Sequence, residues 1–238
     1  MVSDSDARPG AQPAWLHALV VRFALDADSF LAGICEDLSL RHRAHTILLY
    51  GSRADGSANE YSDYDIAAFS GVERTVREAR EVDGQFLDLF IYPDAVLGQP
   101  TADYLTLRGS RIIVQRGDEA SDFLNRLDAI FDLGPAPLPA DELQARRAWA
   151  WKMAARMKRG DIEGAYRRTW LLTVLLDDYF HLRGRWYQGP KKSFQWLGQY
   201  DPETYRAFEV ALAPAASHDS IHELIGRVVG TEDDFPSP

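Results

Sequence analysis

Asp63 and Asp65 are the residues of this 238-residue chain whose type and spacing point most directly to chemistry. They lie two positions apart, and Asp65 opens an apolar run that continues to Phe69. On an extended strand this spacing places both carboxylates on one face of a sheet. Carboxylate oxygens are hard ligands of the kind that Mg²⁺ prefers. The pair therefore predicts a magnesium site at the start of a buried strand.

A Gly-Ser pair precedes these acids, with ten residues between. The apolar run from Ile47 to Tyr50 is too short for a helix and is ended by Gly51, which indicates a buried strand that stops at a sharp turn. Because Gly51 has no side chain, backbone N–H groups can approach a phosphate there, especially if a short helix begins near Ser52. The magnesium would then carry a triphosphate.

A third carboxylate, Asp88, interrupts the apolar strand expected from Phe86 to Ile91. An ionised carboxylate among hydrophobic side chains needs a partner, and both an arginine and a metal ion meet that need. Three clustered carboxylates would also repel one another and raise each other's pKa, unless divalent cations held them ionised. The cluster therefore predicts metal dependence.

Together, Gly51-Ser52, Asp63-x-Asp65 and Asp88 on a following strand resemble the signature of the DNA polymerase beta-like nucleotidyltransferase superfamily. The resemblance covers about residues 46–92. Within that superfamily the chain is most similar to small bacterial enzymes that join a minimal nucleotidyltransferase domain to a helical domain. Aminoglycoside nucleotidyltransferases of the kanamycin type are among them.

The resemblance implies an enzyme that transfers a nucleotide monophosphate from ATP or another NTP to an acceptor hydroxyl and releases pyrophosphate. It implies two Mg²⁺ ions bound by Asp63 and Asp65, with Asp88 as a metal ligand, a general base or both. Arg53, next to the Gly-Ser pair, would contact phosphate. The expected acceptor is a small hydroxylated molecule of aminoglycoside-like character. Two alternatives stay open: an antitoxin-like enzyme that modifies a protein or RNA partner, and a non-catalytic nucleotide-binding module.

Residues after position 140 add further candidates. Pro190 can start a helix whose first turn carries Lys191 and Lys192, and either lysine could reach the β- and γ-phosphates. An ordinary helix connection is the alternative explanation of this turn.

Three acids of the second half compete with Asp88 as the general base, since some enzymes of similar architecture take that residue from outside the nucleotidyltransferase domain. They are Glu163, Asp177 and Asp178.

Periodicity and punctuation predict an α+β nucleotidyltransferase domain over 14–132, a proline-rich linker over 133–139 and an all-helical domain over 141–229. The first domain should hold one mixed sheet with flanking helices. Its expected strands are 46–51, 65–69, 86–92 and 111–115. One helix is expected from Ala14, and a second helical stretch runs to about Leu40. Further helices are expected over 73–81 and 119–130. The second domain should begin helices at the caps Asp141 and Asp161, with further helices at 191–199, 203–213 and 218–228.

Composition and charge narrow the class of protein. The chain has 46% hydrophobic residues and a net charge of −10, which suit a soluble enzyme and make nucleic acid an unlikely partner. Positive charge concentrates in residues 141–199, which hold twelve Lys and Arg against six Asp and Glu. Without a signal-like start or a long apolar run, we expect a cytoplasmic protein that does not enter membranes, and homodimer formation is left open. The lone Cys35 is expected in the core.

Overall fold

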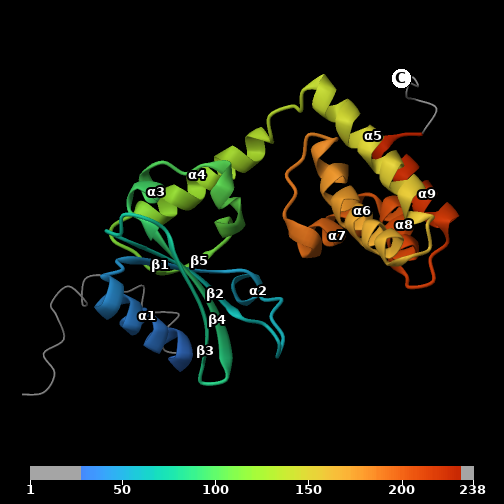
Figure 1. Cartoon of the computed structure of the whole chain (residues 1–238). Helices are drawn as coiled ribbons and strands as arrows, with labels where there is room; N and C mark the ends of the chain where they lie inside the picture. Colours follow the sequence, from blue (N-terminus) through green and yellow to red (C-terminus); the bar gives the residue numbers. More distant parts are fainter. Residues whose placement is uncertain (1–27, 232–238) are drawn as a thin grey trace, which may run out of the picture. The chain divides into compact units, whose positions relative to one another are not determined.

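The computed structural model describes residues 28–231, and the chain divides into two compact units, 1–132 and 133–238. The helix expected from Ala14 begins outside the described residues. The first unit contains a sheet with helices, and the second contains helices alone in its described part (Figure 1). The predicted α+β class, with a mixed sheet followed by a helical region, is confirmed.

Five strands form the sheet of the first unit in the order β3-β4-β2-β1-β5. β2 and β4 are parallel, whereas every other neighbouring pair is antiparallel. The parallel pair exists because β3 returns the chain to the end of the sheet where β2 began. The strands are β1 (Thr46–Tyr50), β2 (Tyr64–Ser70), β3 (Val76–Val82), β4 (Gln85–Pro93) and β5 (Arg111–Val114).

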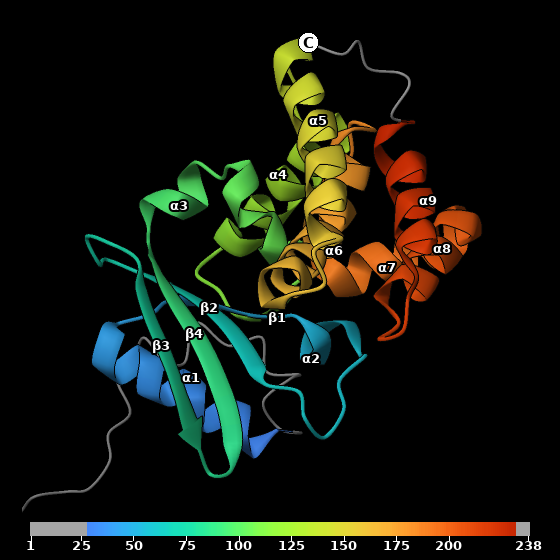
Figure 2. The same ribbon diagram turned by 45° about the vertical axis from the view of Figure 1, so that its right-hand side comes forward.

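Each face of this sheet is covered by a different helix (Figures 1 and 2). Helix α1 (Ser29–His42) buries an apolar stripe against one face, and Cys35 is buried within it as expected. Helix α4 (Glu119–Leu133) packs Phe123 and Leu127 against the other face. The short helices α3 (Ala95–Gly98) and η2 (Ala102–Leu107) extend this second layer. We call the two faces the α1 face and the α4 face.

The helix predicted over 73–81 is wrong, because this segment forms strand β3 at the edge of the sheet. Asp83 and Gly84 make a two-residue hairpin turn between β3 and β4, with φ angles of 49° and 75°. An Asp-Gly pair favours this turn, because both residues tolerate positive φ. Alternating charged residues on β3 suit an edge strand, where they discourage pairing with another chain.

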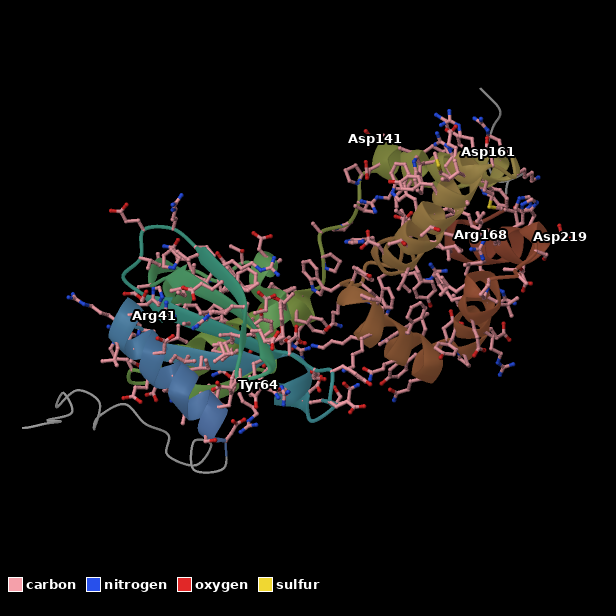
Figure 3. All side chains as sticks on the ribbon, turned by 60° about the horizontal axis from the view of Figure 1, so that its bottom comes forward. Arg41, Tyr64, Asp141, Asp161, Arg168 and Asp219 are labelled. Atoms are coloured by element: carbon pink, nitrogen blue, oxygen red, sulfur yellow. The ribbon has the colours of Figure 1, made fainter. Side chains whose placement is uncertain are left out.

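Five helices make up the described part of the second unit: α5 (Ala140–Met157), α6 (Ile162–His181), α7 (Gly189–Tyr200), α8 (Pro202–Leu212) and α9 (His218–Val229). Their buried apolar side chains form one core. The Asp161 cap of α6 is confirmed, since its side chain accepts from the N–H of Gly164. The Asp141 cap is wrong: the helix begins one residue earlier, after Pro139. Figure 3 labels both aspartates.

Within residues 28–231, no helix combines the length and apolar character needed to cross a bilayer.

Candidate active site

Asp65 and Asp88 lie side by side on the parallel strands β2 and β4, where they are register partners. Their neighbours Ile66 and Leu89 belong to the core beneath α1. Because successive side chains of a strand point to opposite faces, both acids project from the α4 face. β1 ends at the same place, since its last residue, Tyr50, is the partner of Asp65.

The turn after β1 is built against the carboxylate of Asp65. Gly51 has φ 68° and ψ −153°, a backbone conformation that is essentially restricted to glycine. A Cβ atom at this position would lie 2.1 Å from Oδ2 of Asp65. The short helix α2 (Ser52–Asp55) begins immediately afterwards, as expected from the sequence. The structure therefore brings Gly51 and Ser52 to the acid pair, and Gly51 allows the close approach.

The carboxyl of Asp65 lies in an environment that disfavours its negative charge. Among residues 28–231, its side chain makes no hydrogen bond and no ion pair. Burial raises the pKa of this carboxyl to about 6, and the charges of Asp63 and Asp88 add to the increase. An environment that penalises ionisation in this way would be relieved by a bound cation.

Asp88, in contrast, has a cationic partner. Nε and Nη2 of Arg77 donate to its two carboxylate oxygens at 2.9 and 2.8 Å. Arg77 comes from β3, and its guanidinium also lies over the ring of Phe90, 5.0 Å from the centroid. Of the two partners that the sequence left open for Asp88, the arginine is therefore present. Sequence reasoning missed Arg77, because the segment that carries it was expected to be helical.

Arg53 holds the loop before β2 in place. It donates to the backbone carbonyls of Ser62 and Asp63 at 2.7 and 3.1 Å, and to Gln85 at 2.9 Å. Its guanidinium also stacks on the ring of Tyr64, 3.9 Å from the centroid. Tyr64, labelled in Figure 3, packs into the core on the α1 face. The phosphate contact expected of Arg53 stays a prediction, since these interactions assign it a local structural role.

Two tyrosines, which the sequence did not single out, border the acids. Burial, followed by the charge of Asp65, raises the pKa of Tyr50. The pKa of Tyr92 is raised by burial, and then by Tyr104 and Asp88. Both phenols therefore stay protonated at neutral pH and can donate hydrogen bonds to a ligand oxygen. Their signal in the sequence was hidden, because aromatic residues are also ordinary members of strands.

The acids fit a magnesium site by their chemistry, although within the described range no three His, Cys, Asp or Glu side chains converge as a ready-made metal site. Asp65 and Asp88 are adjacent, and the charge of Asp63 acts on Asp65. They supply only carboxylate oxygens, the donors that Mg²⁺ prefers. Asp63, Asp65 and Asp88 are thus the residues that would hold metal.

The remaining candidates belong to the helical unit. Lys191 and Lys192 are exposed in the first turn of α7, which Pro190 opens as expected. Their contact with phosphate stays a prediction. The three competing bases all have cationic or imidazole neighbours: Glu163 pairs with Arg159 and Arg167, Asp177 with His181, and Asp178 with Arg146.

Comparisons with known proteins add little to this geometry. No protein-family model matches the chain, and no curated protein matches it. A solved structure of a nucleotidyltransferase-like protein from Exiguobacterium sibiricum 255-15 is similar over 83% of this chain and 71% of that one. The two share 13% sequence identity, with a TM-score of 0.42. A likeness at this level does not assign a function.

Proposed function

We propose that this chain is a metal-dependent nucleotidyltransferase that transfers a nucleotide monophosphate from an NTP, with ATP as the expected donor, to a hydroxyl of a small molecule. One observation carries the proposal. Asp65 and Asp88 lie level on neighbouring strands beside the glycine turn after β1, and no residue in the described range 28–231 supplies a cation for Asp65. This arrangement suits a magnesium-bound triphosphate.

The proposed residues have distinct roles. Asp63 and Asp65 would hold two Mg²⁺ ions together with Asp88. Bound Mg²⁺ would neutralise the triphosphate and stabilise charge on the attacking and leaving oxygens. The acceptor oxygen forms a bond to the α-phosphorus, and the bond between that phosphorus and the β-bridging oxygen breaks. Pyrophosphate leaves with the electron pair, and the acceptor proton passes to Asp88.

The charge of the first 140 residues favours a cationic acceptor. They contain 22 Asp and Glu against 12 Lys and Arg. A hydroxylated polyamine of the aminoglycoside type combines the required hydroxyl with positive charge, and an acidic surface would concentrate it near the site. Neither modification of a protein or RNA partner nor a purely binding role is favoured by a specific feature of the described residues.

Calorimetric titration of each NTP, with and without Mg²⁺, tests the proposal on the intact chain. We expect one NTP to bind only with Mg²⁺, and Asp65→Asn to weaken this binding at least tenfold. Asp177→Asn serves as the matched control, because it removes a carboxylate of the helical unit that pairs with His181. Pyrophosphate release would then be measured over a panel of aminoglycosides and neutral sugars. Unchanged Mg²⁺-dependent binding in Asp65→Asn would refute the site.

A further inference from the structure

The strongest unassigned feature of the acid site is Arg77. Its guanidinium occupies both oxygens of Asp88 in a two-bond fork, at 2.9 and 2.8 Å. The side chain of Arg77 is 60% exposed, whereas that of Asp88 is 17% exposed. The pair thus joins an exposed guanidinium to a carboxylate that is more deeply buried in the sheet.

Arg77 is well placed to leave this position. It lies on the edge strand β3, and its guanidinium also packs on the face of Phe90. An exposed ion pair contributes little stability, so its exchange for another partner costs little. A divalent cation at the same carboxylate would repel the guanidinium, because the two positive charges would share one anion.

Arg77 also cannot balance the whole site. The charges of Asp63 and Asp88 both act on Asp65, and among residues 28–231 the hydrogen bonds of the Arg77 side chain go to Asp88 alone. Once released, its guanidinium would remain beside these acids, next to any triphosphate they hold through metal. The planar fork that binds a carboxylate also matches phosphate oxygens.

We propose that Arg77 is an exchangeable counter-ion: it neutralises Asp88 in the metal-free protein and moves to the triphosphate when metal takes the carboxylate. This inference rests on the proposed function, because it needs the same metal and NTP. It makes Arg77 a positioning residue with two opposite effects. Arg77 competes with metal when the nucleotide is absent, and it supports binding of the nucleotide when metal is present.

The test uses Mn²⁺ as the probe, with free Mn²⁺ followed by electron paramagnetic resonance. In the absence of nucleotide, we expect Arg77→Met to bind Mn²⁺ about threefold to tenfold more tightly than the wild type, since the variant lacks the cation that competes for Asp88. Arg80→Met is the matched control. Arg80 comes from the same strand but pairs with Asp37 of α1, so this variant should leave Mn²⁺ affinity unchanged.

The second measurement is ATP binding at saturating Mn²⁺. Arg77→Met should bind ATP about tenfold more weakly than the wild type and Arg80→Met, because it loses a charged contact with phosphate. Arg77→Lys, which keeps the charge but not the fork, should fall between. A role in folding alone would not tighten metal binding while weakening nucleotide binding, and thermal unfolding of each variant verifies that it is folded.

The possible failures are distinguishable. If wild type and Arg77→Met bind Mn²⁺ equally, and Asp65→Asn abolishes that binding, the metal site stands and the exchange is overturned. If Arg77→Met binds Mn²⁺ more tightly but ATP equally well, the move to the triphosphate is overturned. If none of the proteins binds Mn²⁺, with or without ATP, both the exchange and the proposed function fail.

Discussion

Acidic residues cluster in two regions of this molecule, and the two clusters differ in the ion pairs that their carboxylates form. In the sheet unit, Asp65 has no cationic partner among residues 28–231, and Arg77 forms an ion pair with Asp88. In the helical unit, Nη1 of Arg146 lies 2.7 Å from Asp178 and 3.7 Å from Asp177. His181 lies 3.1 Å from Asp177 as well. We call Arg146, Asp177, Asp178 and His181 the helical cluster.

The two groups of acids differ in how their charge is balanced within residues 28–231. Asp178 is almost completely buried, with 1% of its side chain exposed, and burial raises its pKa despite the opposing effect of Arg146. Asp178 forms an ion pair with Arg146, which belongs to the adjacent helix α5 of the same unit. Asp65 has no such partner within residues 28–231. Clustered carboxylates alone therefore do not identify a ligand-binding site. A carboxylate that has no cationic partner and lies beside a glycine turn favours one.

The largest effect on stability is expected in the helical cluster. Arg146→Met leaves the buried Asp178 without its cation and should destabilise the protein by about 3 kcal/mol. Arg77→Met should cost much less, because the guanidinium of Arg77 is exposed to solvent. Urea unfolding of both variants measures the contrast. Since protonation of Asp178 relieves the defect, the loss in Arg146→Met should be larger at pH 8 than at pH 5. Equal losses of unfolding free energy in the two variants would contradict the difference between the two ion pairs.

The glycine turn provides the next effect. Gly51→Ala should destabilise the protein by about 2–3 kcal/mol, since it adds a Cβ 2.1 Å from Asp65 to a backbone that only glycine adopts readily. Gly56→Ala is the control: its φ is also positive, but a Cβ there meets nothing within 4 Å, so about 1 kcal/mol is expected. Adding Asp65→Gly to Gly51→Ala should recover part of the loss. Denaturant unfolding that shows no recovery would contradict the clash.

A smaller effect, of opposite sign, is expected at Asp65. Its raised pKa means that ionisation costs the folded state more than the unfolded state, so the penalty grows from pH 4 to pH 6 and persists above. Asp65→Asn should therefore stabilise the metal-free protein at pH 7.5 by about 1–2 kcal/mol, after allowance for solvent screening. The gain should shrink toward pH 4. Adding 10 mM Mg²⁺ should reduce it, because only the wild type binds the ion well.

The smallest effect is expected at Asp177. It is partly exposed, and its contacts with His181 and Arg146 are peripheral to the buried pair. Asp177→Asn should change the free energy of unfolding by less than about 0.5 kcal/mol and leave Mg²⁺-dependent NTP binding intact. Thermal unfolding and calorimetry measure the two quantities. A loss of nucleotidyl transfer without a loss of binding would instead assign Asp177 the role of general base.

Much of the fold could be predicted from the sequence. The strand that ends before Gly51 and the strands that carry Asp65 and Asp88 were expected within a residue or two, because apolar runs bounded by turn residues are a strong local signal. The helices of the second half followed from their caps and apolar spacing, except that Asp141 proved to be a first-turn residue. Strand β3 was missed, although the Asp83-Gly84 turn is a recognisable hairpin signal.

The acids of the site were predictable, but their partners were not. Aspartates in apolar surroundings can be recognised in a sequence without knowledge of the neighbours. The Arg77–Asp88 pair depends on the alignment of β3 with β4, and the clash that fixes Gly51 depends on the pairing of β1 with β2. Such contacts join residues that are distant in the chain, and no local pattern specifies them.

The parallel pairing of β2 with β4 also determines which changes of chain length the site can survive. Asp65 and Asp88 are level only because the two strands are in register. One residue inserted between Gln85 and Asp88 would turn the acid toward the α1 face, since side chains alternate along a strand. The same insertion in the connection at 71–75 would leave both acids in place. Related sequences should therefore vary in length before β3 and stay constant between the hairpin turn and Asp88.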